Sequence, residues 1–184
     1  SMLEPSPPVM ICGPLDKGIR FAFDVGIPEH VVSDTGHANG TRMRDYGGFG
    51  DPASPKNALL VECGQHWERA AEHVAWQTTW RFLRHLDVVD RETASREIVA
   101  EAPAPQRLVR VTEAVVARTP GFRFARAFSG MEVVPNAGDV IAYDGEEPVR
   151  APYDNCVLVM PVPNNIKTGL TAVRLGRIET PRRA

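Results

Sequence analysis

Glycine and proline recur along the whole chain, and their spacing limits how long any helix or strand can be. The 184 residues include 16 prolines and 15 glycines. Proline fixes φ and removes a backbone donor, while glycine favours turns, so regular elements end where these residues cluster. We therefore expect short elements and one long helix, at 66–86. Its apolar face has helical spacing and comprises Trp67, Ala71, Val74, Ala75, Thr78, Phe82 and Leu86.

The pattern of elements changes at the proline-rich stretch 102–105. Before it, the sequence predicts a helix at 15–25 and short strands, at 9–12, 30–33 and 57–62. After it, β-branched runs alternate with turn residues, at 108–116, 122–127, 131–134, 140–143, 156–161 and 170–175. We expect an α/β domain over 1–104, followed by a small all-β domain over 105–184.

Charge and composition exclude several classes of partner. The chain has 21 basic and 23 acidic side chains and no run of like charge, so we expect neither nucleic acid nor an anionic membrane as a partner. No apolar stretch reaches the roughly 20 residues that a membrane helix needs, and the first 30 residues do not have the pattern of a signal peptide. Cys12, Cys63 and Cys156 form no CxxC pair. We expect reduced thiols in a cytoplasmic protein.

The segment LLVECG, at 59–64, is the most informative for chemistry, because Glu62 ends an apolar strand and a glycine follows shortly after it. In open α/β sheets, ligands bind at the carboxyl ends of strands. A carboxylate that is partly removed from water at such a place is suited to proton transfer. The alternative is a glutamate that caps the following helix or forms a salt bridge with it.

The loop at 35–56 is long, rich in glycine and proline, and carries Arg42, Arg44 and Tyr46. A loop of this length in a compact domain is often a lid or a binding loop. Arginine binds carboxylates with two parallel hydrogen bonds, so the loop could recognise a small anion. The alternative is that both arginines are solvated. The glycines do not form a phosphate-binding motif.

Two further sites are weaker hypotheses. His30, Asp34 and His37 have a spacing that could hold a metal only if the loop folds back. Cys63 could serve as a nucleophile, but a structural thiol is the better interpretation, because the sequence does not fix a histidine beside it. His85 is expected on the surface near the carboxyl end of the long helix.

Four segments together resemble the succinylglutamate desuccinylase/aspartoacylase family. They are NALLVECGQHWE at 57–68, the preceding RMRDYGGFGDPASPKN loop at 42–57, and the later pair GDVIAYDG and VRAPYDNCVLV, at 138–145 and 149–159. The resemblance covers nearly the whole chain. It implies a carboxypeptidase-like α/β fold with an added β domain, and zinc-dependent hydrolysis of the amide bond of an N-acyl amino acid.

On this resemblance, Glu62 matches the family's catalytic glutamate, which moves the proton of the attacking water. Arg42, Arg44 and Tyr46 lie where the family keeps its contacts to the substrate carboxylate, and Tyr143 is a candidate for closing over the substrate. The family binds zinc through an H-x-x-E motif and a D-[LI]-H motif, and neither occurs in this sequence. The resemblance therefore implies only part of the carboxypeptidase-like sheet, zinc ligands outside this chain, and a chain that is incomplete for catalysis.

A non-enzymatic function is the alternative. A partial sheet leaves unpaired N–H and C=O groups on an edge strand, and such an edge can pair with another chain. The protein would then be a binding module or subunit, including a homo-oligomer assembled through this edge.

Overall fold

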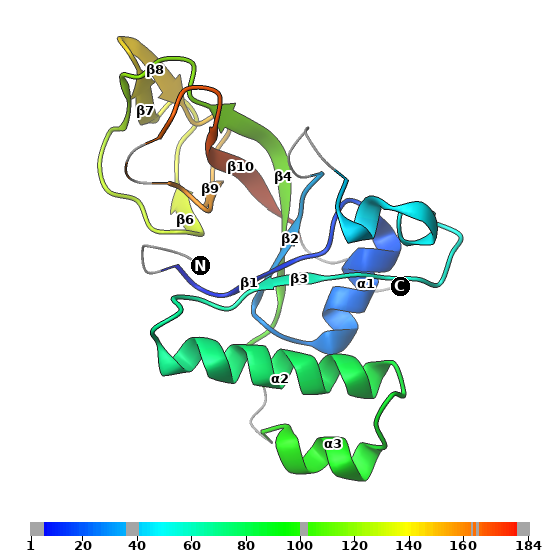
Figure 1. Cartoon of the computed structure of the whole chain (residues 1–184). Helices are drawn as coiled ribbons and strands as arrows, with labels where there is room; N and C mark the ends of the chain where they lie inside the picture. The colour runs from blue at the N-terminus through cyan, green and yellow to red at the C-terminus, as the bar shows by residue number, and fades with distance from the viewer. Residues whose placement is uncertain (1–5, 36–40, 100–102, 163, 165, 180–184) are drawn as a thin grey trace. The chain divides into compact units, whose positions relative to one another are not determined.

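The computed structural model describes residues 6–35, 41–99, 103–162, 164 and 166–179 (Figure 1). These residues form two compact units, one over 7–108 and the other over 109–179 together with Ser6. The first unit mixes helices and strands and the second is built of strands, so the predicted class, α/β followed by β, is confirmed. No described helix is long and apolar enough to cross a membrane.

The first unit contains three short strands and three α-helices. They are β1 (Val9–Ile11), α1 (Asp16–Val25), β2 (His30–Ser33), β3 (Leu60–Glu62), α2 (Arg69–His85) and α3 (Arg91–Glu97). Strands β1 and β2 are parallel and are joined through α1, which makes a βαβ unit. Strand β3 pairs with the other side of β1 and runs antiparallel to it.

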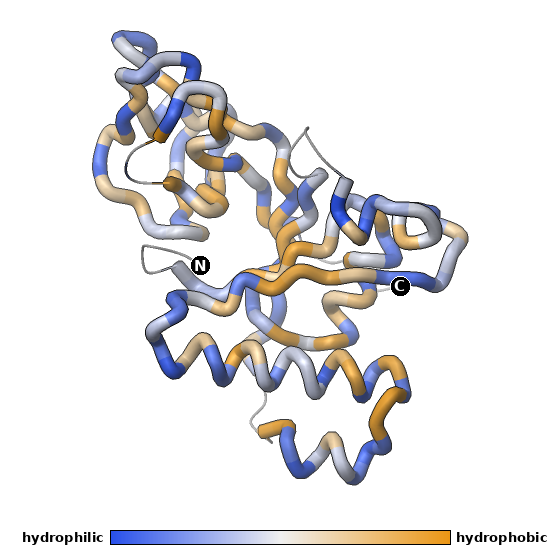
Figure 2. The backbone as a smooth tube through the Cα atoms, in the orientation of Figure 1, coloured by the Kyte–Doolittle hydropathy of each residue, from blue (hydrophilic) through white to orange (hydrophobic). Residues whose placement is uncertain are grey.

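The predicted strand at 57–62 is shorter and less buried than expected. Only Leu60–Glu62 pairs, and the side chain of Leu60 is 42% exposed. The reason is its position, because β3 lies at one edge of the sheet that the described residues form, and a residue there loses contacts on one side. Figure 2 shows the apolar character of β1 and β3 along this part of the sheet.

Helix α1 packs its apolar face on the sheet. Phe21, Ala22 and Val25 are buried, and Ala22 and Val25 belong to one core cluster with Met10 and Val31 of the strands. The α1 helix ends at a glycine in the left-handed region, with φ of 82°, as is common at helix carboxyl ends. The prediction at 15–25 is therefore confirmed to within one residue.

Helix α2 is the long helix predicted from the sequence, but it is shorter than expected. It has 17 residues, and Phe82 packs against Phe21 of α1 with 5.2 Å between ring centroids. Trp67 precedes the helix and is 67% exposed, and Leu86 follows it and is 47% exposed. The prediction that these two residues lie on the buried face of the helix was wrong. The helix begins after Trp67 and ends before Leu86, although the apolar spacing extends over both residues.

Helix α3 was missed because its sequence is mostly charged. The helix nevertheless begins at a typical N-cap residue, Asp90. The carboxylate of Asp90 accepts hydrogen bonds from the backbone N–H and the hydroxyl of Thr93. Gln77 of α2 ties the end of α3 in place, because its amide donates to the carbonyl oxygen of Glu97 and accepts from the N–H of Val99.

The second unit is made of antiparallel strands. They are β4 (Arg107–Val116, whose first two residues belong to the first unit), β5 (Phe122–Phe124), β6 (Glu132–Val134), β7 (Val140–Asp144), β8 (Glu147–Arg150), β9 (Cys156–Val159) and β10 (Thr171–Glu179). Strand β9 pairs with both β10 and β6, and β7 pairs with both β5 and β8. Strand β8 was not predicted, because its EPVR sequence carries only one β-branched residue.

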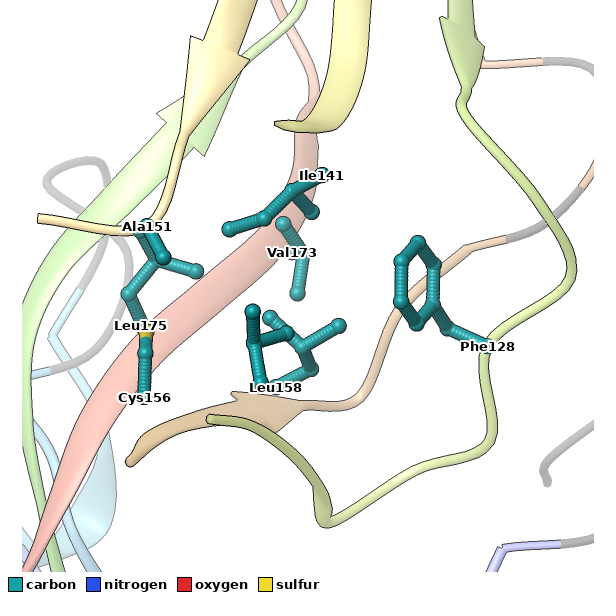
Figure 3. Packing of buried hydrophobic residues seen from close by; sticks show 8 residues of the cluster. Phe128, Ile141, Ala151, Cys156, Leu158, Val173 and Leu175 are labelled. Atoms are coloured by element: carbon teal, nitrogen blue, oxygen red, sulfur yellow. The ribbon is translucent and has the colours of Figure 1, made fainter. Parts of the chain in front are cut away.

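The core of the second unit lies where β7, β9 and β10 meet (Figure 3). Ile141, Leu158, Val173 and Leu175 are fully buried there, and Phe128 covers one side of the cluster. The Cys156 thiol lies in the same cluster, and Cys12, Cys63 and Cys156 form no disulfide.

A buried carboxylate anchors the turn between β7 and β8. Asp144 accepts hydrogen bonds from the backbone N–H groups of Arg118 and Thr119, from the Thr119 hydroxyl and from the Arg118 guanidinium. These bonds, the Thr119 hydroxyl foremost, lower the pKa of Asp144 from 3.8 to about 2. All of them favour the charged form.

We predict that Asp144→Asn destabilises the protein in a pH-dependent way. The depressed pKa stabilises the fold above pH 3.8, and this contribution disappears as the pH falls toward about 2. The difference in unfolding free energy between the wild type and the variant is therefore largest near neutral pH and narrows on acidification. Urea titrations from pH 7 to pH 2 measure it, with the exposed Glu146→Gln as control. A difference that does not change with pH would contradict this role.

Candidate active site

Glu62 is the last residue of β3, and its carboxylate lies at the start of the connection to α2. Its backbone is paired with Val9 of β1. Gly64 has φ of 120°, a conformation that side chains rarely adopt, and it turns the chain away from the strand. A turn at 65–68 follows, in which the Glu68 N–H donates to the carbonyl oxygen of Gln65, and α2 begins at Arg69.

Glu62 lines a hollow of about 540 Å³ between the end of β3 and the first turns of α2. The polar residues of the lining include His66, Glu68, Arg69 and Glu72. Glu62 is half-buried, whereas the other four side chains are exposed. The hollow therefore combines the half-buried carboxylate of Glu62 with two exposed carboxylates, a guanidinium and an imidazole, all within one short stretch of chain.

The alternative interpretation of Glu62 as the helix cap does not match the geometry. The N-cap residue of α2 is Glu68, six residues later, and no side-chain hydrogen bond caps the helix.

The thiol of Cys63, next to Glu62, is not activated as a nucleophile. Burial, together with the charge of Glu62, raises the pKa of Cys63, which favours the protonated thiol over the nucleophilic thiolate.

The arginine loop adopts two short 3₁₀ helices, η1 (Met43–Asp45) and η2 (Gly47–Phe49), where no regular structure was expected. Arg44 is buried, and its Nη2 donates to the carbonyl oxygen of Asp34 at 2.9 Å. Arg42 forms an ion pair with Asp45 at 3.7 Å, and Tyr46 is 72% exposed. The three residues therefore have three different environments.

The structure does not bring the arginine loop to Glu62. Glu62 is level with Val9 at the start of β1, whereas Arg44 packs against Gly13, which lies beyond the end of β1. Four residues of extended chain separate these levels by about 13 Å. The reason is that β3 runs antiparallel to β1, so the carboxyl end of β3 and the carboxyl ends of β1 and β2 lie at opposite edges. The rule for parallel strands was therefore wrongly applied to Glu62.

Tyr143 lies on β7 of the second unit and is half-buried, with the Arg123 guanidinium 4.8 Å from the centre of its ring. The prediction that it closes over a substrate stays a prediction. Arg69, by contrast, was not singled out from the sequence, and it lines the hollow with Glu62. Its only sequence signal is its place in the first turn of the predicted helix.

The described residues do not fit a zinc site. Within the described ranges, no group of three histidine, cysteine, aspartate or glutamate side chains could hold a metal ion. His30 begins β2 and Asp34 follows its end, so about 13 Å of strand separates them. His37, the third member of that hypothesis, lies outside the described residues. His85 ends α2 and is exposed, as predicted, and its Nε2 lies 3.7 Å from the Asp24 carboxylate.

Lys17 of α1 organises the chain that leads into β3. Its Nζ donates to the carbonyl oxygens of Gly48, Asp51, Ser54 and Lys56 at 3.2, 2.6, 3.1 and 2.8 Å. An ammonium group has three protons, so these four acceptors share them. Sequence patterns missed this role, because the acceptors are backbone groups 31 to 39 residues away.

We predict that Lys17→Met lowers the free energy of unfolding by about 1–3 kcal/mol, since it removes charged hydrogen bonds to several carbonyls. It should also speed proteolytic cleavage within 47–56, which limited proteolysis and mass spectrometry would detect. Arg20→Met, on the exposed face of the same helix, is the matched control. Equal cleavage in both variants would contradict the role of Lys17.

No protein-family model and no curated protein matches the chain. Solved structures of several bacterial proteins have a similar fold. Succinylglutamate desuccinylase from Vibrio cholerae is 18% identical with a TM-score of 0.64, over 96% of this chain and 51% of that one. A succinylglutamate desuccinylase/aspartoacylase from Rhodobacter sphaeroides is 14% identical with a TM-score of 0.64, over 96% and 55%. An aspartoacylase family protein from Mesorhizobium loti is 13% identical with a TM-score of 0.61, over 97% and 54%.

The chain has the fold of the succinylglutamate desuccinylase/aspartoacylase structures. The predicted resemblance to this family is confirmed at the level of the fold. The chain spans about half the length of these deacylase structures. The hollow at Glu62 is one place in this fold where a strand end, a helix start and charged side chains meet.

Proposed function

We propose that the protein acts in the hydrolysis of the amide bond of an N-acyl amino acid, with Glu62 as the general base. One observation carries the proposal. Glu62 is half-buried at the end of β3 and lines a hollow of about 540 Å³, in a chain with the fold of desuccinylases and aspartoacylases. A small substrate fits a hollow of this size.

The chemistry assigned to Glu62 is proton transfer. Its carboxylate accepts a proton from water as the water oxygen bonds to the amide carbon, and returns that proton to the nitrogen as the C–N bond breaks. Arg69 of the same lining is the cation that we assign to the substrate carboxylate.

The assignments of Arg42, Arg44, Tyr46 and Tyr143 to the substrate rest on resemblance alone. We therefore propose no contact between these residues and the substrate. Arg44 packs against Gly13, beyond the end of β1, at the edge of the sheet opposite Glu62. Zinc enters the proposal in the same limited way. We propose that zinc, where the enzyme uses it, is held by groups other than the described residues, which do not form a site for it.

We predict that Glu62→Gln lowers kcat by about 10²- to 10⁴-fold with little change in KM, because the amide keeps the size of the side chain and loses its basicity. The measurement is release of free amine from a panel of N-succinyl and N-acetyl amino acids. The assay uses a protein as long as the structural relatives that contains these 184 residues. Zinc content is determined for each variant by elemental analysis.

Glu68→Gln is the matched control, because Glu68 lines the same hollow but is exposed. It should retain kcat to within a few-fold. Full turnover by Glu62→Gln with unchanged zinc content would rule out Glu62 as the base. An increase of KM in Arg69→Gln with unchanged kcat would support the assignment of Arg69 to the substrate carboxylate.

A second candidate function is that of a binding module assembled through the outer edge of β3. The observation that favours it is the exposure of Leu60, 42%, on the outermost strand of the sheet. An apolar side chain on an edge strand promotes pairing with another chain, and a lysine there opposes it.

We predict that the molar mass of the 184-residue chain rises with concentration in light scattering, and that Leu60→Lys abolishes the rise. Thr79→Lys, on the exposed face of α2, is the control and should leave the rise unchanged. A monomer at every concentration would contradict assembly through β3.

A further inference from the structure

The charged side chains that line the hollow at Glu62 do not balance one another. They include three carboxylates, those of Glu62, Glu68 and Glu72, and one guanidinium, that of Arg69. A protonated His66 would still leave the carboxylates in the majority. The backbone at the start of α2 adds about half a positive charge, which is too little to reverse the sign. The lining is therefore negative, and it favours a cation over an anion.

Arg69 and Glu72 carry opposite charges on the same side of α2. They are three residues apart in the first turn of the helix, so their Cβ atoms lie about 5–6 Å apart on one face. Both side chains are exposed. In the part of the chain that the structure describes, the two form no ion pair with each other. Both charges are therefore available to a ligand that carries a carboxylate and a cation.

Trp67 adds an aromatic side chain to the same hollow. It is 67% exposed and lies in the turn that precedes α2. The electron-rich face of an indole attracts an ammonium group. An indole beside carboxylates therefore suits a cationic group better than an anionic one.

Small residues leave space between this turn and the helix. Ala71 and Ala75 of α2 line the hollow. A Cβ added at Gly64 would lie 3.7 Å from the Cβ of Ala71, so the chain stays close to α2 as it turns back from the end of β3 (Figure 1). The hollow of about 540 Å³ beside this contact has room for the side chain of an amino acid.

We propose that this hollow selects N-acyl amino acids whose side chain ends in an alkylammonium group. The inference rests on the proposed function, in which Glu62 is the general base and Arg69 binds the substrate carboxylate. Glu72 accepts hydrogen bonds from the ammonium group, and Trp67 lies against the end of the substrate side chain. An acidic side chain would instead bring a second carboxylate to a negative lining, and such like-charge contacts oppose binding.

The test compares three substrates of similar size, in a protein as long as the structural relatives that contains these 184 residues. Nα-acetylornithine carries an ammonium group, Nα-acetylnorleucine has a methyl group in its place, and Nα-acetylglutamate carries a carboxylate. We expect kcat/KM to be about tenfold higher for acetylornithine than for acetylnorleucine, because an exposed ion pair and a cation–π contact each contribute a few-fold. Acetylglutamate should have the lowest kcat/KM.

Glu72→Lys should reverse the order of acetylornithine and acetylglutamate. Glu92→Lys makes the same change of charge at an exposed position of α3 outside the lining, and it should leave the order unchanged. Equal kcat/KM for the three substrates, a preference for acetylglutamate, or an order that Glu72→Lys does not alter would overturn the proposed selectivity. The proposed hydrolysis would stand in each of these cases.

Absence of turnover with all three substrates would contradict the proposed hydrolysis instead, and binding then decides the selectivity. The probe is the indole N–H cross-peak of Trp67, assigned by its loss in Trp67→Phe, in NMR titrations of the 184-residue chain with the three compounds. We expect a saturable shift with the lowest dissociation constant for acetylornithine. No saturable shift, or tighter binding of acetylglutamate, would overturn the proposal.

Discussion

The antiparallel pairing of β3 with β1 is the constraint on which the rest of the first unit depends. Because Met10 is level with Val61, Glu62 is placed beside the start of β1, and the chain then turns at Gly64 into α2. The same register sends the loop that precedes β3 to the opposite edge, where β1 and β2 end. One pairing therefore creates two chemically different places, a carboxylate at one edge and a buried guanidinium at the other.

The two edges are built by different physical means. At the Glu62 edge, a strand end, a turn and the first residues of α2 lie close in sequence, so one short stretch of chain supplies the lining of the hollow. At the other edge, distant segments are held by long-range polar contacts. Lys17 binds four carbonyls of the loop, and Arg44 donates to Asp34. The second edge therefore depends on the packing of α1, whose Ala22 and Val25 lie in the core.

The sequence predicted what depends on local periodicity and on turn residues. Helices α1 and α2 and strand β2 follow from apolar spacing, and the importance of Glu62 follows from an acid that ends an apolar strand. Strand direction does not follow from such patterns, so the separation of Glu62 from Arg44 was not predicted. Helix α3 was missed because charge hides a seven-residue helix whose main signal is one capping aspartate. The role of Lys17 is invisible because its acceptors are backbone carbonyls.

The direction of β3 is the most direct test of this account. A nuclear Overhauser spectrum of the isotope-labelled chain should show cross-strand backbone contacts between Val9 and Glu62 and between Ile11 and Leu60, as the antiparallel register requires. Contacts of Val9 with Leu60 and of Ile11 with Glu62 would instead establish a parallel strand. That result would bring Glu62 to the edge of Arg44, and it would contradict the separation of the two residues.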